Sequence, residues 1–272
     1  MKSITIKRFK IISAIMLAVL ALLIMPSCEI TPAGTSSNGD NQVDAKTLID
    51  GVYENQIITA NFLVEHVSWQ SSVLGGRLNE ATSKGSAVIF DVNEPTGNSE
   101  YYTYYLLSNN HVVYESPSYT NFECNVIDCY GDGYLARVLV KDASYDLSIL
   151  SFQSKKLYSV LEFSLSDPKK NDTVISIGSP LGVLNAVTVG RVTEYETIDF
   201  GGEVSEEISN VKFSAIKHDC LVNNGSSGGV LLDDKYKVCG INFAAEIDNK
   251  GEFVAGYAVQ ISKVLEFINM QK

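Results

Sequence analysis

Short runs of β-branched and aromatic residues, separated by clusters of glycine, asparagine, aspartate and proline, recur along this chain of 272 residues. Such runs predict strands, and the clusters between them predict turns. Many short strands at close spacing indicate an all-β fold, either a barrel or a sandwich. We predict strands at residues 86–90, 101–107, 134–140, 147–152, 174–177, 187–193, 230–232, 238–242 and 253–259.

Only the last stretch of the chain has a helical period. Ile261, Val264, Leu265 and Ile268 fall on one face, with polar residues between them, which predicts a short C-terminal helix. Near the middle, the polar segment 166–172 interrupts the β pattern. We expect it to connect two halves of the fold.

Residues 1–27 have the pattern of a secretion signal. They contain four basic residues and no acidic one, followed by an apolar run over residues 11–25. This run is shorter than the roughly 20 residues that a membrane-spanning helix needs. The segment Met25-Pro26-Ser27-Cys28 resembles a bacterial lipobox, which implies lipid attachment at Cys28, although Pro26 departs from the usual pattern. The alternative is an uncleaved membrane anchor with a free Cys28.

The rest of the chain is expected outside the cytoplasm, held by a lipid at the outer surface of the cytoplasmic membrane. Residues 28–46 are polar and rich in turn formers, which predicts a flexible tether to a globular domain over residues 47–272. Without residues 1–27, the chain keeps 17 basic and 32 acidic residues, a formal charge of about −15. Such a surface makes nucleic acid a poor partner.

Four cysteines remain beyond the signal: Cys124, Cys129, Cys220 and Cys239. They can form two disulfides in an oxidising compartment or stay as buried free thiols, and both alternatives are open. Their spacing differs from the paired short spacings of zinc sites. We expect neither a metal nor a cofactor.

Three segments supply the groups that serine nucleophilic catalysis needs: a base, a carboxylate and oxyanion donors. His111 lies in a polar turn after an apolar strand, and Asp146 directly precedes another. Ser227 lies in the turn Gly225-Ser226-Ser227-Gly228-Gly229, whose glycines permit a sharp bend and close approach to a substrate. Each segment alone is common in loops that have no catalytic role. Together they have the order His, Asp, Ser that chymotrypsin has.

Several segments, in the same order, resemble the HtrA (Deg) group of trypsin-like serine proteases, over about residues 55–270. Residues 108–113 (Ser-Asn-Asn-His-Val-Val) resemble its Thr-Asn-x-His-Val-Val, and residues 146–150 its Asp-Leu-Ala-Val-Leu. Residues 176–182 and 187–193 resemble Ala-Ile-Gly-Asn-Pro-Leu-Gly and Val-Thr-x-Gly-Ile-Val-Ser. Residues 218–229 parallel Thr-Asp-Ala-Ala-Ile-Asn-Pro-Gly-Asn-Ser-Gly-Gly, and residues 240–242 and 256–259 match Gly-Ile-Asn and Gly-Phe-Ala-Ile.

This resemblance implies a chymotrypsin-like double six-stranded antiparallel β-barrel, with barrel one at about 55–165 and barrel two at about 172–260. It implies a serine endopeptidase acting on proteins or peptides through an acyl-enzyme, with a role in protein quality control as one option. Ser227 is then the nucleophile, His111 the general base and Asp146 the residue that orients it. The oxyanion hole falls at Gly225, Ser226 and Ser227, through the amides of Gly225 and Ser227.

The substrate pocket is expected at Leu221, Ile241, Asn242 and Phe243. No acidic residue occupies the Leu221 position, which argues against a requirement for lysine or arginine. Glutamyl endopeptidases resemble one another in a threonine and a histidine at the positions that Val222 and Asn242 occupy here. We expect a preference for small or medium aliphatic residues before the scissile bond.

The chain departs from the HtrA pattern at Asn224, Ser226 and Cys220, where the group has proline, asparagine and alanine. It continues only briefly past the second barrel, so we expect no PDZ domain and no regulation through one. HtrA proteases often form trimers, which makes a homo-oligomer one option here.

Several alternatives stay open from the sequence. His218, beside Asp219, competes with His111 as the base. A catalytically silent lipoprotein that binds a protein partner is the main rival function, and an esterase would need a strand-turn-helix elbow that the segment after Ser227 does not suggest. The acidic stretch 194–207 either steers basic substrate segments or is a solvated loop.

Overall fold

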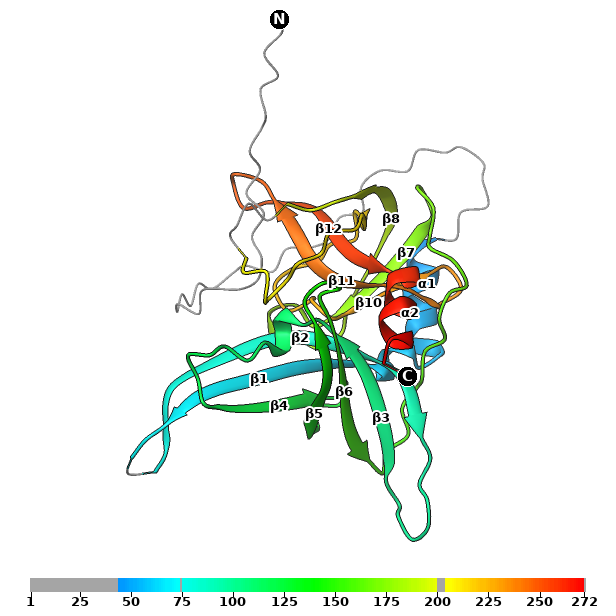
Figure 1. The fold of residues 1–272 in the computed structure, drawn as a ribbon. Coiled ribbons are helices and arrows are strands. Elements are labelled where there is room, and N and C mark those ends of the chain that lie inside the picture. The colour runs from blue at the N-terminus through cyan, green and yellow to red at the C-terminus, as the bar shows by residue number, and fades with distance from the viewer. Residues whose placement is uncertain (1–43, 74, 200–203, 272) are drawn as a thin grey trace, which may run out of the picture.

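The computed structural model describes residues 44–73, 75–199 and 204–271. The predicted signal, Cys28 and all but the end of the predicted tether lie outside these ranges. The described chain forms two closed six-stranded antiparallel barrels, one above the other in Figure 1. This confirms the predicted all-β double barrel.

The first barrel joins its strands in the order β1-β2-β3-β6-β5-β4, and the second in the order β10-β11-β12-β9-β8-β7. The first contains β1 (Asn61–Ser71), β2 (Arg77–Asn93), β3 (Tyr102–Ser108), β4 (Asn121–Ile127), β5 (Gly133–Asp142) and β6 (Leu147–Ser154). The second contains β7 (Thr173–Gly178), β8 (Ala186–Glu196), β9 (Ala215–His218), β10 (Val230–Asp233), β11 (Val238–Ile247) and β12 (Phe253–Gln260). Side chains fill both interiors, because small barrels leave no room for a channel.

Three of these strands, β1, β4 and β9, are not among the runs named from the sequence pattern. In β4, Cys124 and Val126 are buried between more exposed neighbours, so the alternation is real but short and interrupted by polar residues. Strand β9 has four residues, and its last is the buried His218, which hides its apolar character.

Helices α1 and α2, near the two ends of the described chain, lie beside the second barrel (Figure 1). Helix α2 (Ile261–Asn269) confirms the predicted C-terminal helix and buries Ile261, Val264 and Phe267. Helix α1 (Ala45–Glu54) was not predicted. It begins inside the segment expected to be a tether, and a Cβ at its Gly51 would lie 1.8 Å from the Tyr236 hydroxyl. A larger residue at this position would require the Tyr236 side chain to move.

The predicted connection 166–172 lies between β6 and β7, the last strand of one barrel and the first of the other. Cys124, Cys129, Cys220 and Cys239 are all free thiols, and only Cys129 is partly exposed. No helix in the described ranges is long and apolar enough to span a membrane.

Candidate active site

The three predicted catalytic residues come from three connections that meet where the barrels face each other. His111 begins the short 3-10 helix η2 (His111–Val113) that follows β3, and Asp146 lies in the turn between β5 and β6. Ser227 lies in the segment between β9 and β10 of the second barrel. All three are largely buried, with 8%, 1% and 9% of their surface exposed.

Both carboxylate oxygens of Asp146 contact His111. Oδ2 lies 2.8 Å from His111 Nδ1, and Oδ1 accepts a hydrogen bond from the His111 backbone N–H at 3.0 Å. Since a buried carboxylate accepts but does not donate, the ring proton belongs on Nδ1. The Nε2 atom is then left as a base that can accept a proton.

The backbone of Asp146 is in the left-handed region, with φ of 50°. Such a conformation costs a non-glycine residue about 1–3 kcal/mol and needs support from its surroundings. The Asn109 side chain donates to the Asp146 carbonyl at 2.7 Å, and the Asp146 N–H donates to Ala143. Tyr145 anchors the same turn to α2 by a 2.6 Å hydrogen bond to Glu266. The sequence reasoning did not identify Asn109 or Tyr145 as supports of this residue.

The turn that carries Ser227 is pressed against the first barrel. The Ser86 N–H on β2 donates to the Ser227 carbonyl at 2.6 Å. A Cβ at Gly228, where φ is 83°, would lie 2.0 Å from the Ser86 carbonyl oxygen and 2.5 Å from the Ser108 hydroxyl. Gly85 touches both sides of the site, since a Cβ there would lie 2.5 Å from Val112 and 2.9 Å from the Ser227 carbonyl. Only glycine fits at these positions.

Across the described ranges, the Ser227 hydroxyl makes no hydrogen bond, including to His111. Catalytic hydrogen bonds are often long without substrate and shorten when it binds. The structure therefore joins His111 to Asp146 directly, and Gly85 lies between the Ser227 carbonyl and Val112, the chain neighbour of His111.

Two of the three predicted oxyanion positions present a free amide. Among the described residues, the N–H groups of Gly225 and Ser227 have no hydrogen-bond partner. The Ser226 N–H instead donates to the Asn223 carbonyl at 2.8 Å and closes a turn in which Gly225 has φ of 96°. Ser226 thus belongs to the turn but does not offer its own amide.

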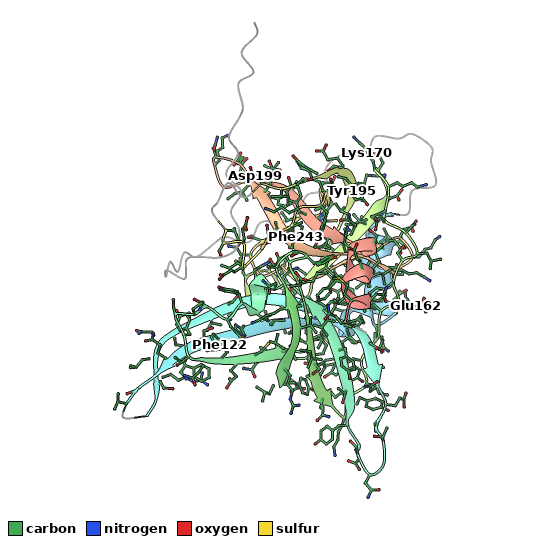
Figure 2. The ribbon with its side chains drawn as sticks, viewed as in Figure 1. Phe122, Glu162, Lys170, Tyr195, Asp199 and Phe243 are labelled. Carbon is green, nitrogen blue, oxygen red and sulfur yellow. The ribbon has the colours of Figure 1, made fainter. Side chains whose placement is uncertain are left out.

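A shallow depression lies beside Ser227. Its lining residues are Val222, Asn223, Asn224, Ser226, Ser227, Asn242, Phe243, Ala244 and Ala245. Figure 2 shows Phe243 in the second barrel, near its junction with the first. Two of the four expected pocket residues, Asn242 and Phe243, are in this lining. Leu221 instead lies outside it and is 61% exposed, and Ile241 is fully buried in the core.

His218 lies beneath this pocket, against Asn242 of its lining. It is fully buried, and its Nε2 lies 3.0 Å from the Asn242 Oδ1. Burial lowers the pKa of His218 to about 4. Its neighbour Asp219 accepts a hydrogen bond from the Arg191 N–H at 2.6 Å. His66 is buried in β1, where it stacks on Phe122. Neither histidine is paired with a carboxylate as His111 is.

The acidic stretch after residue 194 is partly neutralised. Lys217 Nζ lies 3.6 Å from Glu194, 2.8 Å from Glu196 and 3.2 Å from Glu246. Further along, Asn110 donates to the backbone carbonyls of Glu207 and Ile208, so this part of the segment packs against the His111 loop. In the described ranges, no three His, Cys, Asp or Glu side chains are grouped so that they could hold a metal ion.

Residues 85–241 match the family described as trypsin-like peptidase domain. The chain is 29% identical over 213 residues to the serine protease Do-like HtrA of Lactobacillus helveticus, covering 77% of this chain and 48% of that protein. It is 27% identical over 191 residues to the periplasmic serine endoprotease DegP of Escherichia coli, covering 70% and 36%. The chain thus spans half or less of the length of these curated relatives.

Two solved structures share the fold. The HtrA-type protease AlgW, solved with a tripeptide, aligns with a TM-score of 0.60 at 24% identity, over 82% of this chain and 62% of that one. The Rv3671c protease in an inactive form aligns with a TM-score of 0.58 at 20% identity, over 82% and 93%.

Proposed function

The chain belongs to the trypsin-like peptidase domain family, and we propose that it is a serine endopeptidase that hydrolyses protein substrates through Ser227, His111 and Asp146. The observation that carries this proposal is the pairing of His111 Nδ1 with Asp146 Oδ2 at 2.8 Å, in the loops next to the Ser227 turn. The similarity to proteins named serine protease HtrA and serine endoprotease DegP supports the same activity.

The reaction follows from the positions of these groups. Ser227 Oγ attacks the scissile carbonyl, and Nε2 of His111 takes its proton. Asp146 stabilises the resulting imidazolium. The free amides of Gly225 and Ser227 donate to the oxyanion of the tetrahedral intermediate. The imidazolium then protonates the leaving amine, and a water molecule deacylates Ser227 by the same steps.

We further propose that the pocket accepts small or medium aliphatic side chains before the scissile bond. None of its lining residues is charged, and Val222, Phe243, Ala244 and Ala245 give the lining an apolar part. A buried charge without a partner in such a pocket is costly, so lysine, arginine and glutamate side chains fit poorly.

The activity is tested with a peptide library digested by the wild type and by Ser227→Ala. We expect cleavage mainly after valine, alanine, isoleucine or leucine with the wild type, and none with the variant. Cleavage by both proteins would assign the activity to a contaminant or to another residue. Cleavage mainly after glutamate, lysine or arginine would contradict the pocket. A folded wild type that cleaves nothing but still retains a bound protein partner would favour the silent binding module.

We also propose that the protein works outside the cytoplasm and is held at the membrane by a lipid attached to Cys28. The signal-like pattern of residues 1–27 supports this, as does the relative named periplasmic serine endoprotease. Labelled palmitate fed to cells should be incorporated into the wild type and not into Cys28→Ala. Equal incorporation by both, or by neither, would contradict the anchor.

A further inference from the structure

The Ser86 hydroxyl is a contact between the barrels that the mechanism above does not use. Ser86 lies on β2 of the first barrel and is fully buried. Its Oγ–H donates to the Gly225 carbonyl at 2.7 Å and accepts a hydrogen bond from the Ser179 N–H at 2.8 Å. One hydroxyl therefore joins the oxyanion turn to the segment that begins at Ser179.

The Gly225 amide depends on how two neighbouring peptide groups are held. The described peptide bonds contain no cis form, so each N–H points away from the carbonyl of its own peptide group. The Asn224 carbonyl accepts from the Leu181 N–H at 2.7 Å, which turns the Gly225 N–H to the opposite side. The Gly225 carbonyl is held by Ser86 on the next peptide group.

Gly225 needs both of these contacts because a glycine does not restrict its own φ. It has no Cβ, so its φ of 96° is set by the groups that hold the peptides on either side. Ser86 contributes to both sides at once. It holds the Gly225 carbonyl directly, and through Ser179 it holds the segment from which Leu181 reaches Asn224. The HtrA pattern has proline at the Asn224 position. Asparagine lacks the proline ring, so it does not restrict the backbone of the turn in that way.

We propose that Ser86 is a positioning residue that holds the oxyanion amide of Gly225 in its donating orientation, linking the first barrel to the oxyanion hole of the second. This inference rests on the proposed serine peptidase function. It assigns no contact between Ser86 and substrate. Its effect falls on the transition state, because the oxyanion exists only after the serine has attacked.

The kinetic test compares Ser86→Ala with the wild type on a peptide substrate. Removing a direct oxyanion donor lowers kcat by about 10² to 10³-fold. A variant that keeps the donor but holds it less firmly should lose less kcat. We expect Ser86→Ala to lower kcat by about 10 to 100-fold, with KM changed less than about threefold, as for an interaction made only in the transition state. Ser86→Cys keeps a weak donor of similar shape, so its kcat should lie between those of the wild type and Ser86→Ala.

Ser151→Ala is the matched control. Ser151 lies on β6 of the same barrel and is 9% exposed, and its hydroxyl has no hydrogen-bond partner among the described residues. Its removal should leave kcat and KM within about twofold of the wild type, since nothing joins it to the turn. An equal loss of kcat in Ser151→Ala and Ser86→Ala would overturn the proposal, because it would show a general effect of losing a buried hydroxyl.

Hydrogen–deuterium exchange of the same variants can be measured even if the protein has no peptidase activity. We expect faster exchange in Ser86→Ala over residues 223–229, where Ser226 and Gly229 donate within the turn, and unchanged exchange over β5 and β6. An inactive wild type would contradict the proposed function, but the exchange of Ser86→Ala and the wild type could still be compared. Unchanged exchange over residues 223–229, or a kcat within twofold of the wild type, would overturn the role of Ser86.

Discussion

Asp146 contacts His111 through two different atoms, the ring Nδ1 at 2.8 Å and the backbone N–H at 3.0 Å. The backbone contact holds the loop while the ring contact sets the tautomer, so one carboxylate fixes both the place and the tautomer of His111. The strained φ of Asp146 is the conformation in which both contacts are made at once.

Asp146→Asn should lower kcat by about 10⁴-fold while the protein stays folded. The amide can still accept from the His111 backbone, but it presents an N–H to Nδ1 and so places the ring proton on Nε2. Steady-state kinetics with circular dichroism as a check of folding measures the effect. Turnover near that of the wild type would remove Asp146 from the mechanism.

Gly228→Ala should displace the nucleophile turn, because the added Cβ would lie 2.0 Å from the Ser86 carbonyl oxygen. We expect activity to fall more than about 100-fold and the free energy of unfolding to fall by about 2–3 kcal/mol. Gly131→Ala is the matched control, since its φ is 90° and a Cβ there meets nothing within 4 Å. It should cost about 1 kcal/mol and leave activity unchanged. Equal losses of stability and activity in the two variants would show that the positive φ alone, and not the clash with Ser86, causes the effect of Gly228→Ala.

The buried His218 should make the protein sensitive to acid. Burial lowers its pKa to about 4 in the folded state, against about 6.5 in the unfolded chain. Between these values the unfolded state binds more protons, so stability falls as the pH drops from about 6.5 to 4, by about 3 kcal/mol in all. His218→Gln should lose less of its free energy of unfolding over this range, as measured by urea unfolding at several pH values. Parallel curves for the two proteins would contradict this origin of the acid sensitivity.

The buried cysteines should be unreactive in the folded protein. Burial raises the pKa of the Cys124 and Cys220 thiols to about 12 and that of Cys239 well above its usual value. Only the thiolate reacts readily with alkylating reagents. Iodoacetamide at pH 8 should modify these three cysteines in urea but not in the native state, as mapped by mass spectrometry. Fast native modification of any of them, or a disulfide between two of them, would contradict the structure.

The fold was largely readable from the sequence because most strands alternate buried and exposed residues or are continuous apolar runs. The exceptions have local causes. Strand β4 places Asn125 among its apolar residues, and β9 is short and ends in a buried histidine. Helix α1 was hard to recognise because it contains Gly51, which disfavours a helix, and its contact with Tyr236 is visible only in the fold.

The candidate site was only partly predictable, and the reason is that its supports are common residues. His111, Asp146 and Ser227 stand in distinctive segments, and the structure pairs the first two directly. Ser86 and Asn109 act through hydrogen bonds between segments far apart in the chain, and no local pattern marks them. Leu221 lies outside the lining of the depression beside Ser227 and is exposed, and no local pattern in the sequence marks that position.

The proposed identity of the nucleophile is tested most directly by treating the folded protein with a fluorophosphonate probe and locating the label by mass spectrometry. We predict a single labelled site, Ser227, and its loss in His111→Gln, because the hydroxyl then has no base. Labelling of a different serine, or a folded wild type that takes no label at Ser227, would contradict the account.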